Sequence, residues 1–176
     1  SEMCIRDRFN MFIYADNAAT TKTSEAAIKA MVDIMNNVYG NPSSLHTTGQ
    51  KAKEALEKAR LDVAKCIGAN FKEIYFTSGG TEGNNMAIIG SANANKRAGN
   101  RVITTKIEHS SVANPMKYLE KQGFDVVYLP VDNNGIVDME VLKKEMTKDT
   151  ILVSIMNVNN EVGAIEPVSE IGKYIK

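Results

Sequence analysis

Residues 101–156 decide the fold, and they read RVITT KIEHSSVANPMKYLEKQGF DVVYL PVDNNGIVDMEVLKKEMTKD TILVSIM. Three short apolar runs within this stretch are rich in the β-branched residues that favour strands. They occupy residues 101–105, 125–129 and 150–156. Longer segments with helix signals separate the runs, so the stretch predicts parallel strands joined by helical crossovers. The predicted fold class is α/β, with a mostly parallel sheet and helices on both faces.

The two segments between these strands carry helix signals of their own. Pro115 is favoured at the first position of a helix, so the first helix is predicted to begin near Asn114 and to end before Gly123. Asp138 is a suitable N-cap for the second helix, which is predicted to reach Met146.

Toward the N-terminus the sequence predicts one more strand, EIYFT at residues 73–77, and then a helix over residues 81–96. Two earlier helices are predicted over residues 24–37 and 52–67, and Gly68 is a natural stop for the second of them.

Both ends of the chain carry further expectations. Ser24 and Ser169 are predicted N-caps of the first and the last helix. The last helix is predicted to continue to Lys176, so that the chain stops within it, as in an incomplete domain. Residues 1–10 have no periodicity and precede Met11, and we expect them to be a non-native or disordered leader.

Composition narrows the class of protein. The 176 residues are 43% hydrophobic and 24% charged, as in a soluble globular protein, and 21 Lys+Arg balance 21 Asp+Glu. A neutral chain without a basic run gives no reason to expect nucleic acid or an anionic membrane as a partner. No apolar stretch is long enough to span a membrane. Two cysteines without a disulfide framework and the absence of a secretory signal lead us to expect a cytoplasmic protein.

The two cysteines, Cys4 and Cys66, form neither a disulfide framework nor a metal-ligand spacing, so no metal site is predicted. Cys66 lies between Val63 and Ile67 on a predicted helix and is expected to be a buried structural thiol rather than a catalytic one.

Ligands of open α/β sheets lie beyond the carboxyl ends of the strands, and the first loop of interest there is residues 78–84. Gly79 and Gly80 allow the backbone to approach an anion closely, and the following helix start offers N–H groups. Thr81 adds a hydroxyl donor. The loop therefore has the features of a phosphate cradle, although a tight turn with Thr81 as an ordinary N-cap explains it equally well.

The second loop, residues 105–111, contains His109, one of only two histidines. A histidine at a strand end can stack on an aromatic ligand or transfer protons near neutral pH. The alternative is a half-exposed histidine that caps the next helix.

The third loop, residues 157–163, contains Asn159, Asn160 and Glu161 directly after a buried strand. These side chains supply amide donors and a carboxylate where a ligand would lie. The alternative is an Asn-rich turn with bonds from side chain to backbone. Because the three loops follow different parallel strands, we expect them to converge on one crevice.

These loops, together with two earlier segments, resemble the motifs of cysteine desulfurases of the NifS/IscS type. Five segments agree in order and spacing with that family between about Phe12 and Lys176: YADNAATT at 14–21, GNPSS with His46 at 40–46, TSGGTE at 77–82, Glu108–His109, and NNEVG at 159–163. The resemblance gives no role to His46, and a structural role explains this histidine at least as well as a functional one. Five motifs in register are specific for this group of class V aminotransferase-like enzymes, and less specific for one substrate.

The resemblance implies a fold-type-I, pyridoxal 5'-phosphate (PLP) dependent transferase that works as a homodimer. Gly80 and Thr81 would hold the PLP phosphate, and Asn160 would bond the ring oxygen. His109 would be catalytic, stacking on the ring and assisting proton transfer. Residues 11–40 would be an N-terminal segment associated with the small domain, and residues 41–176 the first part of a truncated large domain.

The same resemblance implies what lies outside this chain. Such enzymes carry PLP on a lysine within Ser-x-His-Lys, preceded by an Asp and a Gln that contact the ring. A loop cysteine attacks the substrate sulfur, and a C-terminal arginine holds the substrate carboxylate. All would lie beyond Lys176, so this chain alone is expected to be inactive.

The implied function of the whole enzyme is removal of sulfur from L-cysteine, giving L-alanine and an enzyme persulfide for iron–sulfur cluster or thiocofactor synthesis. A sulfur-acceptor or scaffold protein is a possible partner. Three alternatives stay open: another class V enzyme such as a selenocysteine lyase, a non-catalytic truncated fragment, and a generic phosphate- or nucleotide-binding α/β module. The last explains only the Gly-Gly loop.

Overall fold

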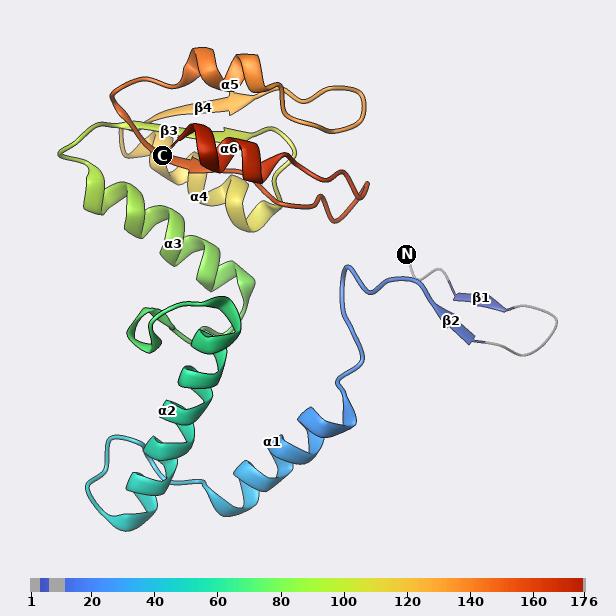
Figure 1. Ribbon diagram of the computed structural model, residues 1–176, viewed down its shortest axis with the longest axis vertical. Helices are drawn as coiled ribbons and strands as arrows, with labels where there is room; N and C mark the ends of the chain where they lie inside the picture. The colour runs from blue at the N-terminus through green and yellow to red at the C-terminus, as the bar shows by residue number, and fades with distance from the viewer. Residues whose placement is uncertain (1–3, 7–11, 176) are drawn as a thin grey trace. The chain divides into compact units, whose positions relative to one another are not determined.

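The computed structural model describes the backbone of residues 4–6 and the whole of residues 12–175. The chain divides into two compact units between Phe76 and Thr77 (Figure 1). The second unit contains the sheet and most of the predicted site residues.

The sheet of the second unit has three strands, β3 (Arg101–Thr105), β4 (Asp125–Leu129) and β5 (Thr150–Ser154). Their order is β4-β3-β5, and both neighbouring pairs are parallel. The three predicted strands are therefore confirmed, although the last one ends at Ser154, two residues earlier than expected.

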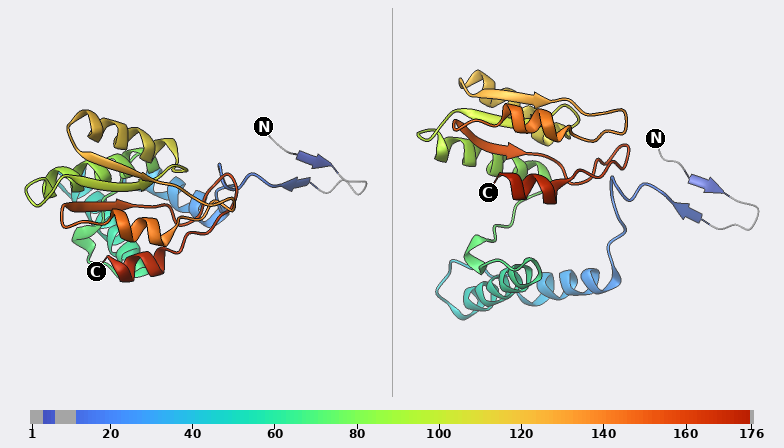
Figure 2. Two further views of the ribbon diagram at one scale, coloured as in Figure 1. Left: turned by 90° about the horizontal axis from the view of Figure 1, so that it is seen from above. Right: turned by 45° about the horizontal axis from the view of Figure 1, so that its top comes forward.

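Helices cover both faces of this sheet. The second unit has α3 (Gly80–Asn95), α4 (Ser110–Lys121), α5 (Met139–Glu145) and α6 (Val168–Tyr174). Figure 2 shows α4 on one side of the sheet and α5 and α6 on the other. Successive side chains of β3 lie on opposite faces of the sheet. Val102 packs with α3 and α4, and Ile103 packs with α5 and α6. The predicted two-sided α/β architecture is confirmed.

The start of α4 differs from the prediction. The helix begins at Ser110, not near Asn114, because the His109 side chain accepts a hydrogen bond from the backbone N–H of Ser111 and caps the helix one turn earlier. Pro115 consequently lies inside α4, where it is buried. The helix ends before Gly123, as predicted.

The predicted strand at residues 73–77 is wrong. Phe71–Glu73 form a 3₁₀ turn, η1, which is held by a capping box between Asn70 and Glu73. Residues 74–77 have no strand partner among the described parts of the chain, and Tyr75 and Phe76 are exposed. An apolar run forms a strand only where a neighbouring strand accepts its backbone hydrogen bonds.

The last helix also differs from the prediction. It starts at Val168 with Pro167 as its N-cap, so Ser169 lies inside it, and it ends at Tyr174 with Ile175 as its C-cap. The predicted caps Ser24 and Asp138 are both confirmed, because their side-chain oxygens accept hydrogen bonds from backbone N–H groups of the first turn.

The described residues of the first unit form two α-helices, the 3₁₀ turn η1 and a two-stranded ribbon. The helices are α1 (Glu25–Asn37) and α2 (Thr47–Ile67), and Gly68 ends α2 in the left-handed conformation with φ +67°, as expected for a C-terminal glycine. Strand β1 (Cys4–Arg6) pairs antiparallel with β2 (Phe12–Tyr14).

Cys66 is exposed, so the prediction of a buried thiol is wrong. Ala64, two residues earlier on α2, is the buried residue, and a separation of two residues turns the side chain to the far side of a helix.

Apart from the backbone of β1, the predicted leader at residues 1–10 lies outside the described residues, and its origin stays a prediction. The assignment of residues 11–40 and 41–176 to two domains also stays a prediction.

Candidate active site

A hollow of about 280 Å³ lies at the carboxyl ends of β3 and β5, next to the starts of α3 and α4. We call it the His109 hollow. Its lining residues come from all four elements or the loops that follow them: Asn84, Glu108, His109, Val112, Ser154, Ile155 and Met156. This is the edge of the sheet at which open α/β folds bind ligands.

His109 is exposed at this edge and is held through one ring nitrogen. Its Nδ1 accepts a bond from the backbone N–H of Ser111 at 3.1 Å and lies 2.8 Å from the Ser111 hydroxyl oxygen. The side-chain amide of Asn84 donates to that hydroxyl at 2.8 Å. His109 therefore caps the next helix, as the alternative interpretation of this residue predicted. Its Nε2 is still available to a ligand.

Glu108 ties the two strand ends together. Its Oε1 accepts from the Thr105 hydroxyl at 3.0 Å and from the backbone N–H of Met156 at 2.9 Å. Burial raises the pKa of Glu108 above its ordinary value, these two bonds oppose the rise, and the negative charge of Glu166 adds to it. The loops after β3 and β5 are thus joined by a carboxyl group that holds its proton to higher pH than usual.

The shift of Glu108 predicts a pH dependence of stability. Its pKa is raised in the folded protein, so folding binds a proton between the ordinary value of 4.5 and the folded value. The stabilisation is complete below 4.5 and is lost as the pH rises through the folded pKa. Glu108→Gln keeps an acceptor oxygen without the charge, so the free energy of unfolding of the variant relative to the wild type is expected to increase with pH. Urea unfolding from pH 4 to 8 measures this difference.

Glu82 provides a matched control with the opposite sign. Hydrogen bonds from the Ser78 hydroxyl and backbone N–H to its Oε2 lower the pKa of Glu82. Its stabilisation is present above the ordinary pKa and is lost as the pH falls, so Glu82→Gln is expected to be most harmful near neutral pH. Parallel pH profiles for the two variants would refute the Glu108 interpretation.

The start of α3 is open. Its N-cap, Gly79, makes no side-chain cap bond, and the N–H groups of Gly80 and Thr81 have no acceptor among the described residues. A Cβ atom placed on Gly79 or Gly80 would meet nothing within 4 Å. The exposed Thr81 is the first residue of this turn with a side-chain donor. Thr81 lies within α3 rather than at its N-cap, so the cap alternative for this residue is wrong.

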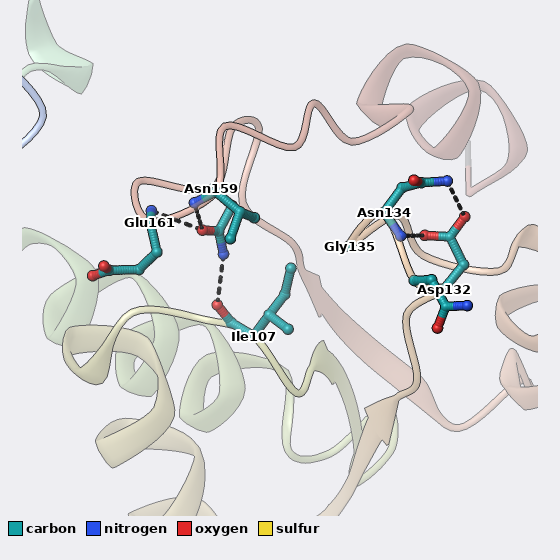
Figure 3. Close-up of a pocket in the computed structure, with 8 residues that line it drawn as sticks. Ile107, Asp132, Asn134, Gly135, Asn159 and Glu161 are labelled. Atoms are coloured by element: carbon teal, nitrogen blue, oxygen red, sulfur yellow. Dashed lines mark hydrogen bonds between the residues drawn. The ribbon is translucent and has the colours of Figure 1, made fainter.

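The loop after β5 places two asparagines differently. Asn159 is 5% exposed, and it donates to the carbonyl of Ile107 at 3.2 Å and accepts from the N–H groups of Glu161 and Val162. Figure 3 shows this amide between the loops that follow β3 and β5. Asn160 is exposed, and its amide donates to the Glu161 carboxylate at 2.9 Å. Asn159 holds the loop, and Asn160 is left accessible.

A second hollow in the same unit is lined by Ile107, Asn159, Glu161, Val162 and the turn Asp132–Gly135 (Figure 3). In this turn Asp132 accepts from the backbone N–H groups of Asn134 and Ile136.

The predicted site residues are therefore distributed as follows. His109 lines the His109 hollow, whereas Gly80, Thr81 and Asn160 line neither of the two hollows, and their convergence on one crevice stays a prediction. Sequence reasoning missed the linking roles of Glu108 and Asn159. The available signal was a polar side chain in a loop directly after a buried strand.

Among residues 4–6 and 12–175, no helix is long and apolar enough to cross a membrane. The described side chains also contain no group of three His, Cys, Asp or Glu residues placed to hold a metal ion.

Comparison with known proteins gives a consistent family. The aminotransferase class-V domain matches residues 13–176. A protein named cysteine desulfurase IscS from Dictyoglomus turgidum is 51% identical over 164 residues, which is 93% of this chain and 42% of the relative. The chain thus spans less than half the length of the relatives it matches.

Solved structures agree. A NifS-like protein has a TM-score of 0.88 at 43% identity over 92% of this chain and 44% of its own. SspA in complex with cysteine has a TM-score of 0.83 at 35% identity, covering 90% of this chain and 46% of that one. The resemblance to cysteine desulfurases is confirmed, and the chain belongs to the aminotransferase class-V family.

Proposed function

We propose that the complete protein to which this chain contributes is a PLP-dependent cysteine desulfurase, converting L-cysteine to L-alanine and leaving the sulfur as a persulfide on the enzyme. The observation that carries this proposal is the placement of His109 at the carboxyl ends of two parallel strands, with Nδ1 held and Nε2 available. The relatives named cysteine desulfurase support it, as does the neighbour solved in complex with cysteine.

The start of α3 fits the phosphate of PLP. A dianionic phosphate is stabilised by unpaired N–H groups at a helix N-terminus, and Gly80 and Thr81 provide such groups among the described residues. A Cβ atom placed on Gly80 would meet nothing within 4 Å. We assign the ring to His109 and the ring oxygen to Asn160. When bound, PLP would supply the electron sink for the bond changes in the substrate.

The residues of this chain would then bind and orient PLP. The open turn of α3 would anchor the phosphate, and His109 would stack on the ring and exchange a proton through Nε2. Glu108 keeps the loops after β3 and β5 in register. No Ser-x-His-Lys sequence occurs in the 176 residues. The lysine that carries PLP and the thiolate that takes the sulfur would come from the rest of the protein.

We further propose a cytoplasmic homodimer that passes sulfur to an acceptor or scaffold protein for iron–sulfur cluster or thiocofactor synthesis. The relatives named IscS support this placement.

The phosphate assignment predicts the effect of Thr81→Val. Valine has the shape of threonine without the hydroxyl, and Thr81 is exposed, so stability is expected to change little. A hydrogen bond to a charged group is worth about 1.5–3 kcal/mol, so PLP affinity is expected to fall about 10–100-fold. Equilibrium titration of the apoprotein with PLP measures the loss.

Thr81→Ser, which keeps the hydroxyl, is the matched control and is expected to bind PLP within about threefold of the wild type. Equal affinity of the serine and valine variants would contradict the assignment of Thr81 to the phosphate.

The proposed function is tested by reading the coding sequence beyond Lys176 and assaying the complete protein. We expect Ser-x-His-Lys followed by a cysteine-bearing loop, and alanine formed from L-cysteine in the presence of PLP. Faster turnover of selenocysteine would favour a selenocysteine lyase. A stop codon directly after Lys176 would leave a non-catalytic fragment and refute the proposal.

A further inference from the structure

We propose that Asn84 and Ser111 are positioning residues that fix the tautomer of His109, so that neutral His109 carries its proton on Nε2. The three side chains form one hydrogen-bonded chain from α3 to the cap of α4. The tautomer itself is a property of the folded chain, and its catalytic meaning rests on the proposed function.

The contacts are short and come from separate elements. The amide nitrogen of Asn84, in the first turns of α3, lies 2.8 Å from Oγ of Ser111 in the first turn of α4. That oxygen lies 2.8 Å from Nδ1 of His109. Ser111 is 6% exposed, so water has little access to compete for its hydroxyl.

The direction of the protons follows from what each group can donate. A backbone N–H is only a donor, so the Ser111 N–H at 3.1 Å makes Nδ1 an acceptor. The Asn84 amide nitrogen is also only a donor, so it occupies a lone pair of the Ser111 hydroxyl and leaves the hydroxyl proton free to point at Nδ1. The backbone N–H and the hydroxyl of Ser111 therefore both favour an Nδ1 that carries no proton. The neutral imidazole must then hold its proton on Nε2.

This arrangement sets what His109 presents to a ligand. Since Nδ1 is engaged with α4, Nε2 is the nitrogen free for exchange, and in the neutral ring it is a donor. In the proposed reaction, neutral His109 would thus begin as the group that gives a proton.

His46 offers a comparison within the same chain. It caps α2 in the same manner, with Nδ1 accepting from the backbone N–H of Gly49 at 3.2 Å, but no hydroxyl bond to its ring is found in the described structure. The Asn84–Ser111 pair is the feature that distinguishes the two histidines.

Asn84→Asp tests the direction of the chain with almost no change of shape. A carboxylate cannot donate, so the Ser111 hydroxyl would turn toward Asp at this position and withdraw its proton from Nδ1. Ser111→Ala removes the same bond outright. Losing one hydrogen bond is expected to lower the ratio of Nε2–H to Nδ1–H tautomer about fivefold in each variant.

The measurement is nitrogen NMR of the complete protein labelled with ¹⁵N-histidine, without PLP and at alkaline pH, where imidazole is neutral. The His109 signals are assigned by their loss in His109→Asn. Asn85→Asp is the matched control, because Asn85 donates to the Thr81 carbonyl and not to Ser111. It is expected to leave the His109 ratio unchanged.

A wild-type His109 with its proton mainly on Nδ1 would overturn the proposal. So would a ratio that stays unchanged in both Asn84→Asp and Ser111→Ala, or that falls equally in Asn85→Asp. The readout needs neither PLP nor L-cysteine, so it can succeed if alanine formation fails, and the two proposals are tested separately.

Discussion

Alanine formation from L-cysteine is expected to fall about 10²–10⁴-fold when His109 is replaced by asparagine in the complete protein, the range for loss of a general acid–base group. Asparagine is a strong N-cap, so its side chain can take over the bond from the Ser111 N–H that starts α4. The variant therefore removes the ring and its Nε2 while keeping the helix start. Steady-state assay of alanine at saturating PLP measures the loss.

The matched variant is His109→Ala, which removes both the ring and the cap. Loss of a cap costs about 0.5–2 kcal/mol, so this variant is expected to unfold more readily than His109→Asn while being equally inactive. If His109→Asn keeps more than about a tenth of the wild-type rate, His109 is a helix cap alone, and its catalytic assignment fails.

A free energy of unfolding lower by about 2–5 kcal/mol is expected for Leu119→Ala, the usual range for a large apolar side chain removed from a core. Leu119 is 0% exposed and lies on the inner face of α4, within the cluster that includes Ile88, Val102 and Met116. The loss would loosen α4, the helix that His109 caps. Urea denaturation followed by circular dichroism measures it.

Leu119→Met preserves most of the volume and is expected to cost less than about 1.5 kcal/mol. A loss from Leu119→Ala no larger than that from Leu119→Met would show that this face of α4 is not packed as described.

Much of the fold follows from local pattern. The runs at 101–105 and 125–129 are rich in β-branched and aromatic residues, and each became a strand over the predicted residues. Asp138 and Ser24 capped their helices as expected, because a cap depends only on residues two or three positions away. The predicted start of α4 was wrong by one turn, because His109 caps the helix before the start that Pro115 indicated.

The predicted strand at 73–77 and the predicted burial of Cys66 were wrong for the same reason. Both features depend on contacts with residues that are distant along the chain. EIYFT at 73–77 has the composition of a strand, but the sheet of the described structure offers it no adjacent strand. Cys66 lies near apolar residues in sequence, but on α2 the buried side is that of Ala64.

The α/β class, the resemblance to the class V family and the polar loops after the parallel strands all follow from the amino-acid sequence, because period, propensity and motif are local properties. Two contacts could not be predicted from local sequence. The Asn84 amide donates to the hydroxyl of Ser111, 27 residues away, and Glu108 accepts from the N–H of Met156, 48 residues away. These contacts form when strands pair and helices pack on them. The hydrogen bonds that position His109 and its loop therefore depend on the tertiary structure, and the local motif around His109 does not determine them.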